Sequence, residues 1–430
     1  MPEFADYTSV RIIAAICILA VAAYLFLALF QPGLKYKIVA PPDGSPASAE
    51  FLRMIEALAD AKLNPQTSIE VIPNGENFYK AELEAIHAAQ KNINLEAYIF
   101  QRGRVTRDLV AALADRARAG IKVNLLLDGI GSFSTPKHYF KDLQKAGGHV
   151  EWYHPLRWNT WPRYNNRTHR ELIIIDGRTA FVGGAGFADH WLYPKGENKR
   201  WRDTMFRVQG EAVASLQSTF AGNWLEGSGE IIAGADYFPF AKHNGSATAM
   251  VVNSEPSVGG STRARILFQT LLASAKQSIH ITTPYFLPDK SMRDEMLRAV
   301  KERGVEITIV APGKHSDHSL TRSSSRRLYG DLLAAGAKIY EYKPAMIHAK
   351  ILTIDGVWSV VGSTNFDNRS FGLNDEINVA ILDRDLAARL EQSFQSDIGE
   401  SEEITYQQWQ ARSIVERAGE WLGWLIERQE

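Results

Sequence analysis

Cysteine is almost absent from this chain of 430 residues, and its single cysteine, Cys17, excludes an intrachain disulfide framework. An excess of one charge is also lacking, since 48 Lys and Arg residues face 49 Asp and Glu residues and give a formal net charge of −1. No global positive field therefore attracts nucleic acid, which is not an expected partner. No Cys, His, Asp or Glu cluster has the spacing of metal ligands. The sequence thus predicts neither a metal nor a cofactor.

Long apolar runs are lacking except near the N-terminus, where the 19 residues 12–30 (IIAAICILAVAAYLFLALF) carry no charge. As a helix with a rise of ~1.5 Å per residue, this run spans ~28 Å, close to the ~30 Å hydrocarbon core of a bilayer. A cleaved signal peptide is the competing interpretation, but its apolar region is usually about 7–15 residues long. The run predicts an N-terminal transmembrane helix within an anchor of residues 1–36. We therefore expect a single-pass membrane protein.

The rest of the chain repeats one order of elements. Strand-like runs at 91–100 and 277–286 are each followed by a helix-like segment, a buried strand-like run and two further strands. Short apolar runs that alternate with helical patterns of about 10–15 residues indicate βαβ units. Two such series predict a duplicated α/β fold with a mixed or parallel sheet in each half.

Composition sets the expected domain boundaries. A stretch rich in Pro, Gly, Ser and Ala predicts a linker over 37–66. The first half is expected over 67–245 and the second over 246–402, with the junction near a Gly- and Ser-containing stretch. The tail, 403–430, places apolar residues on one helical face and predicts an amphipathic helix. Such a helix either caps the second half or contacts lipid through its tryptophans.

The later of two related motifs, IHAKILTIDG followed by VVGSTNF, carries the clearest chemical signal. On an extended chain residues two apart point the same way, so His348 and Lys350 share a face. Asp355 precedes a glycine at a turn, where we expect it to bind backbone N–H groups rather than to react. Lys350 supplies a point charge, and Ser363 and Asn365 supply hydrogen-bond donors. Together these groups suit a phosphate.

The earlier motif, THRELIIIDG, keeps His169 and Asp176 at the same spacing but has Glu171 in the lysine position. Its Gly-Ser-x-Asn element reads GGAG, with Gly184 in place of the serine and Gly186 in place of the asparagine. Glycine permits close approach, so we expect backbone N–H groups around Gly184 to bind the substrate in place of the missing side chains. A carboxylate at Glu171 would repel a phosphodiester.

Two histidines suit one phosphodiester reaction. A neutral imidazole attacks phosphorus and forms a covalent intermediate. A second, protonated imidazole donates to the leaving alkoxide and then activates the acceptor hydroxyl. Because each half supplies one histidine, this need explains why the motif is duplicated.

These motifs, together with TPYFLPD at 283–289 and WRDT at 201–204, resemble the phospholipase D superfamily, and within it the bacterial cardiolipin synthases. The resemblance spans nearly all of residues 67–402. It implies two α/β/α halves with one shared active site and a phosphohistidine intermediate. It also implies a location in the bacterial inner membrane and a phospholipid substrate there, phosphatidylglycerol, which would give cardiolipin and glycerol. It indicates no oligomeric state.

The resemblance also implies roles for the site residues. In the superfamily the histidine of the first half is usually the nucleophile, here His169, and the second acts as acid and base, here His348. An acidic residue after each Gly-Ser-x-Asn element orients the histidine of its half. Glu376 holds that place in the second half, and Asp203 is the candidate in the first.

Glu171 leaves three explanations open. It pairs with a nearby cation, Arg163, Arg167 or Arg170, so that the charge of the site stays favourable. Alternatively, the first half keeps the fold and has lost the chemistry. In the third explanation the halves have exchanged roles, with His348 as the nucleophile.

Three other functions remain as alternatives. The same residues support phospholipase-D-type hydrolysis, because exclusion of water decides between water and alcohol as acceptor. A histidine pair also supports a nucleic-acid phosphodiesterase, whose binding to DNA would depend on salt. A protein without activity would be a lipid-binding or scaffold protein, with Glu171 as the mark of the loss.

Overall fold

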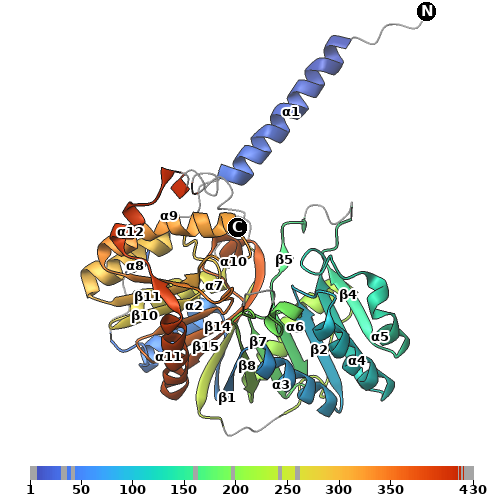
Figure 1. The fold of residues 1–430 in the computed structure, drawn as a ribbon. Helices are drawn as coiled ribbons and strands as arrows, with labels where there is room; N and C mark the ends of the chain where they lie inside the picture. The colour runs from blue at the N-terminus through green and yellow to red at the C-terminus, as the bar shows by residue number, and fades with distance from the viewer. Residues whose placement is uncertain are drawn as a thin grey trace, which may run out of the picture.

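The computed structural model describes residues 7–30, 36–39, 44–157, 163–194, 199–240, 245–256, 262–414, 416–417 and 420. Two α/β halves lie side by side in Figure 1, and the N-terminal helix α1 (Tyr7–Phe30) projects away from them. The mixed α/β fold predicted from the alternating runs is confirmed.

One sheet runs through both halves. At its centre β1 (Leu63–Pro73) pairs antiparallel with β9 (Ala247–Ser254). Outward from β1 the order is β8 (Thr204–Gln209), β7 (Thr179–Gly183), β6 (Leu172–Ile175), β2 (Asn92–Ala97), β3 (Lys122–Asp128) and β4 (His149–Tyr153). Outward from β9 it is β15 (Asn374–Leu382), β14 (Trp358–Gly362), β13 (Ile351–Ile354), β10 (Ser278–Thr282), β11 (Glu306–Pro312), β12 (Lys338–Tyr342) and β16 (Ser401–Glu403).

The two sides of this sheet repeat one topology. Strands β2, β3 and β4 are parallel to one another, as are β10, β11 and β12, and the other neighbours on the main path are antiparallel. Strand for strand, the order outward from β1 matches the order outward from β9 through β12. The repeat read from the sequence is therefore a repeat of strand order and direction.

Helices cover the faces of both half-sheets. In the first half they are α3 (Gly75–Ala88), α4 (Arg104–Arg118), α5 (Lys141–Lys145) and α6 (Ala212–Ser228). In the second they are α7 (Arg263–Ser274), α8 (Lys290–Arg303), α9 (Ser319–Ala335), α10 (Asn368–Gly372) and α11 (Arg384–Gly399). Helices α6 and α11 pack on the central strands, so their apolar residues share one buried cluster across the junction. This cluster fixes one half against the other.

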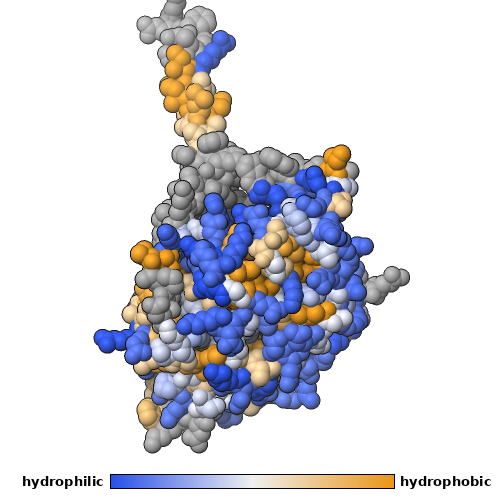
Figure 2. All heavy atoms as spheres, turned by 90° about the vertical axis from the view of Figure 1, so that its left-hand side faces the viewer, coloured by the Kyte–Doolittle hydropathy of each residue, from blue (hydrophilic) through white to orange (hydrophobic). Residues whose placement is uncertain are grey.

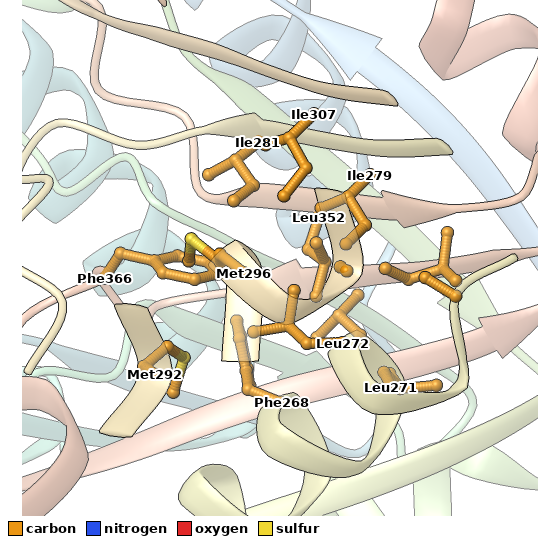
Figure 3. Packing of buried hydrophobic residues seen from close by; sticks show 14 of the residues in the cluster. Phe268, Leu271, Leu272, Ile279, Ile281, Met292, Met296, Ile307, Leu352 and Phe366 are labelled. Carbon is orange, nitrogen blue, oxygen red and sulfur yellow. The ribbon is translucent and has the colours of Figure 1, made fainter. Parts of the chain in front are cut away.

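The core of the second half holds the strand that follows His348. In Figure 3, Leu272 of α7 and Ile279 of β10 point toward Leu352 of β13, and Met296 of α8 lies in the same cluster. All four side chains are buried, and full burial of one such side chain contributes roughly 1.5–3 kcal/mol. The start of β13, and with it the motif just before it, is therefore firmly positioned.

The segment predicted as a linker contains a helix, α2 (Ala49–Ala59). Ser48 caps it by accepting a hydrogen bond from the Phe51 N–H group (3.2 Å). Phe51, Ile55 and Ala59 recur every four residues and are buried in the core of the second half. This helical pattern was assigned to the linker because a Pro- and Gly-rich stretch comes directly before α2. In the tail, α12 (Tyr406–Gln410) is short, and residues 415, 418, 419 and 421–430 of the predicted amphipathic helix lie outside the described residues.

Helix α1 presents apolar side chains to solvent. Ile13 and Leu19 are 62% and 68% exposed, and Figure 2 shows such side chains above the mostly hydrophilic side of the second half. Within the described part of the chain, no helix combines the length and the hydropathy needed to cross a membrane.

Candidate active site

Each motif histidine is bound through its backbone to the opposite half. The short strand β5 (Arg167–Thr168) pairs with β15, and the His169 N–H group donates to the Asp375 carbonyl (2.9 Å). The His348 N–H group likewise donates to the Arg202 carbonyl (2.7 Å). Both histidines therefore lie just before the strands of their own motifs, at the junction between the halves.

The carboxylates that orient the histidines also come from the opposite half. His169 Nδ1 lies 2.9 and 3.1 Å from the two carboxylate oxygens of Glu376, and His348 Nδ1 lies 3.0 Å from Asp203 Oδ2. The structure differs here from the pairing expected within each half, because the two histidine segments cross the junction. A carboxylate at Nδ1 fixes the tautomer that leaves Nε2 for chemistry.

Asp203 is buried, and both of its carboxylate oxygens have hydrogen-bond partners. Its Oδ1 accepts from the Thr204 N–H group (2.8 Å), and its Oδ2 accepts from Trp191 Nε1 (3.1 Å) as well as facing His348. Burial alone would raise the pKa of Asp203, but the hydrogen bond and charge of His348 and the charge of Lys350 lower it overall. The group is therefore ionised at neutral pH.

Glu376 binds Ser363 in addition to His169. The Ser363 hydroxyl donates to Glu376 Oε2, and Asn374 Nδ2 donates to Oε1 (3.4 Å). Ser363 was predicted to face the phosphate. In the structure it instead binds the carboxylate of Glu376, which in turn orients His169. Asn365 differs, because its side-chain Oδ1 is buried and has no hydrogen-bond partner in the described residues.

Lys350 lies against the His348 ring, as the two-residue spacing predicts. Its Nζ is 2.8 Å from Nδ1, 3.0 Å from Nε2 and 2.9 Å from the backbone oxygen of His348. Burial lowers the pKa of Lys350 to about 8 against the opposing charges of Asp203 and Glu376. The pKa of His348 is also lowered, first by burial and then by the Lys350 charge. His348 is therefore neutral at neutral pH.

The arginines near Glu171 are paired elsewhere, so the proposed pairing of Glu171 with one of them is wrong. Each of the three contacts another carboxylate in the described residues, and Arg170 is itself completely buried. These ion pairs are Arg163–Glu226, Arg167–Asp128 at 3.5 Å and Arg170–Glu96 at 3.7 Å.

Glu171 is instead buried, with its Oε1 accepting a hydrogen bond from the Ile99 N–H group (3.0 Å). Burial raises the pKa of Glu171 well above its usual range, although the backbone N–H groups of Ile99 and Tyr98 and the Lys350 charge oppose the shift. The shift favours the neutral acid, and a neutral side chain does not repel phosphate as a carboxylate does.

Gly184 lies where no larger residue fits. A Cβ atom there would lie 2.8 Å from the His348 backbone oxygen, 2.8 Å from Lys350 Cδ and 3.0 Å from Asp203 Oδ1. The glycine-rich loop of the first half thus packs directly on the motif of the second half. Gly184 is required for this contact.

The motif aspartates hold strand ends, as predicted for Asp355. Asp176 and Asp355 both adopt φ = 54°, a left-handed conformation that aspartate tolerates in turns. Each carboxylate accepts hydrogen bonds from three successive N–H groups where β2 or β10 begins. The donors are Gln90, Lys91 and Asn92 for Asp176, and Lys276, Gln277 and Ser278 for Asp355.

Aromatic residues line both histidines and were not predicted. The Tyr98 ring lies 5.1 Å from the His169 ring, and Trp191 and Trp201 lie 5.5 and 5.6 Å from the His348 ring. Tyr98 directly follows β2, and Trp201 is the first residue of the WRDT motif. These positions next to strand and motif could have predicted that both residues lie near the site. The described residues contain no group of three side chains suited to a metal.

A repeated α/β sheet that brings one histidine from each half to the junction is the architecture of the phospholipase D superfamily. The family model described as "Cardiolipin synthase, PLD-like domain" matches residues 83–224 and 268–398. The chain therefore belongs to the cardiolipin synthase family of phospholipase-D-like proteins and is an enzyme of the phosphatidyltransferase type.

Individual proteins show the same likeness. The major cardiolipin synthase ClsA of Bacillus subtilis is 34% identical over 85% of this chain and 76% of its own length. Cardiolipin synthase 1 of Staphylococcus epidermidis (strain ATCC 12228) is 35% identical over 88% of this chain and 77% of its own. In fold, the phosphatidylserine synthase of Haemophilus influenzae matches with a TM-score of 0.68 and 14% identity, over 88% of this chain and 99% of that protein.

Proposed function

We propose that this protein transfers the phosphatidyl group of one phosphatidylglycerol to the free glycerol hydroxyl of a second, giving cardiolipin and glycerol. The observation that carries the proposal is the pair of histidines, each oriented at Nδ1 by a buried carboxylate from the opposite half. The relatives that are named cardiolipin synthases support the choice of substrate.

In the proposed reaction His348 is the nucleophile. Its Nε2 attacks phosphorus, an N–P bond forms, and the bond from phosphorus to the leaving glycerol oxygen breaks while His169 donates a proton to that oxygen. His169 then takes the proton of the acceptor hydroxyl, which attacks phosphorus and frees His348. The neutral state of His348 beside Lys350 favours this assignment. The superfamily resemblance favours the reverse, with His169 as the nucleophile.

A phosphodiester with a p-nitrophenyl leaving group separates the two roles, because p-nitrophenolate leaves without a general acid. We expect His169→Ala to release a burst of about one equivalent of p-nitrophenol per enzyme and then to stall. We expect His348→Ala to release none. A burst from His348→Ala and none from His169→Ala would assign the attack to His169.

The overall reaction is tested by lipid mass spectrometry on the purified full-length chain in phosphatidylglycerol vesicles. Cardiolipin from the wild type, and none from His169→Ala or His348→Ala, supports the proposal. Phosphatidic acid alone would make the protein a hydrolase. No turnover of any phospholipid by the wild type would favour the lipid-binding or scaffold alternative.

Helix α1 is the proposed membrane attachment. Its described side chains form a continuous exposed run, which suits insertion among lipids. A variant that lacks residues 1–36 should no longer float with phosphatidylglycerol vesicles in a density gradient, while its far-ultraviolet circular dichroism per residue stays similar. Flotation of the truncated chain at the level of the full chain would place the attachment elsewhere.

A further inference from the structure

Glu171 and Gly186 are two departures from the motif of the second half, and in space they form one contact. They take the places of Lys350 and Asn365 in the repeat. A Cβ atom on Gly186 would lie 2.7 Å from Glu171 Oε1 and 2.6 Å from the Ile99 backbone oxygen. An asparagine at position 186 therefore cannot coexist with Glu171 in this position. The glutamate carboxyl occupies the space into which the asparagine side chain would extend.

The two oxygens of Glu171 differ in their surroundings. Oε1 accepts the hydrogen bond from the Ile99 N–H group. Oε2 is buried and has no hydrogen-bond partner in the described part of the chain. Asn365 shows the same feature in the other half, since its Oδ1 is buried without a partner there. A buried polar atom without a partner costs free energy unless a ligand satisfies it.

We propose that Glu171 binds the substrate as a neutral carboxylic acid, with the O–H group on Oε2 donating a hydrogen bond to a non-bridging phosphate oxygen. This inference rests on the proposed function and names a phosphate-binding role for the residue that departs from the motif. Because Oε1 is already an acceptor for Ile99, the proton belongs on Oε2. The raised pKa of Glu171 agrees with this protonation state.

The charge of the site explains why an acid serves better here than a lysine. Lys350 is already a buried cation with a pKa of about 8, and its charge acts on Glu171. A second buried ammonium nearby would disfavour the charged state of both lysines. A neutral donor adds a hydrogen bond to the phosphate without that repulsion.

The test compares Glu171→Gln with Glu171→Ala in the full-length chain, using the p-nitrophenyl phosphodiester and phosphatidylglycerol vesicles. We expect Glu171→Ala to lower kcat roughly 100-fold, as loss of a donor to a developing anion does. Glutamine has a similar shape and donates a hydrogen bond, so Glu171→Gln should lose no more than about fivefold. Thermal unfolding of each variant shows whether it is folded.

The outcomes separate the two proposals. If Glu171→Ala keeps the wild-type kcat, or if Glu171→Gln is as slow as Glu171→Ala while both are folded, the donor role is overturned. If the wild type cleaves the soluble diester and makes no cardiolipin, the proposed function fails while the variants still test the donor. If the wild type is inactive on both substrates, calorimetry measures the binding of inorganic vanadate to the wild type and to Glu171→Ala. Weaker binding by Glu171→Ala than by the wild type supports the donor, and equal binding or none by the wild type overturns it.

Discussion

Lys350 shows how burial sets the chemistry of single residues in this site. Its ammonium touches both ring nitrogens of His348, and its pKa of about 8 is below its ordinary value of 10.5. The charge is therefore present at neutral pH but is lost within the range in which enzymes are assayed. Burial shifts the pKa of Glu171 upward instead of downward, and for an acid this shift also favours the neutral form.

The pH dependence of activity should follow Lys350. As pH rises through about 8, the cation that binds the phosphate is lost, so kcat/KM for the soluble diester should fall. The unfolded lysine keeps its proton to about 10.5, so the Lys350 contribution to the free energy of unfolding should rise between about 8 and 10.5. Rate and urea-unfolding profiles from pH 6 to 10 measure both effects. An unchanged alkaline fall and an unchanged stability profile in Lys350→Met would assign them to other groups.

Gly186 makes a prediction about stability. A methyl group there would meet Ile99 and Glu171 at 2.6–2.7 Å, so Gly186→Ala should destabilise the fold by about 1–3 kcal/mol. Gly222 of α6 is the matched control, because a Cβ atom on it meets nothing within 4 Å. Gly222→Ala should be neutral or stabilising. Urea unfolding of both variants checks this, and equal effects would contradict the close contact at Gly186.

At the scale of elements, much was predictable from local pattern. Strands β3 and β11 are nearly continuous apolar runs, because helices cover the sheet on both faces. The turn after each motif was predictable because an Asp-Gly pair tolerates the left-handed backbone conformation of tight turns. Helix α2 was missed because it follows a Pro-rich stretch and because its burial depends on the distant core of the second half.

The motif aspartates should act on stability rather than on chemistry. Asp355→Asn keeps a side chain that tolerates the left-handed turn but removes the charge that binds three N–H groups, so we expect a loss of about 1–3 kcal/mol. Asp355→Ala should lose about 1 kcal/mol more, because alanine disfavours φ = 54°. Unfolding curves test the stability. A kcat more than about tenfold lower in a fully folded Asp355→Asn protein would instead place Asp355 in the chemistry.

At the scale of the whole molecule, the pairing of carboxylates with histidines was not predictable from the sequence. Spacing within a motif reports on neighbours within one half, whereas Asp203 and His348 are 145 positions apart and Glu376 and His169 are 207 apart. The crossing arises because β5 adds to β15 and residue 202 bridges to 347. Neither half therefore holds both a motif histidine and the carboxylate that orients it.

Double-mutant cycles on the free energy of unfolding test this crossing directly. Asp203→Ala and His348→Ala should show a coupling free energy of about 1–3 kcal/mol, since the two side chains are in contact. Asp203→Ala and His169→Ala should be additive within about 0.5 kcal/mol, because no hydrogen bond joins these residues in the part of the chain that the structure describes. In the same way, Glu376→Ala and His169→Ala should show a coupling free energy of about 1–3 kcal/mol. Glu376→Ala and His348→Ala should be additive within about 0.5 kcal/mol. Coupling confined to Asp203–His169 and Glu376–His348 would mean that each half orients its own histidine, and that the exchange across the junction does not occur in solution.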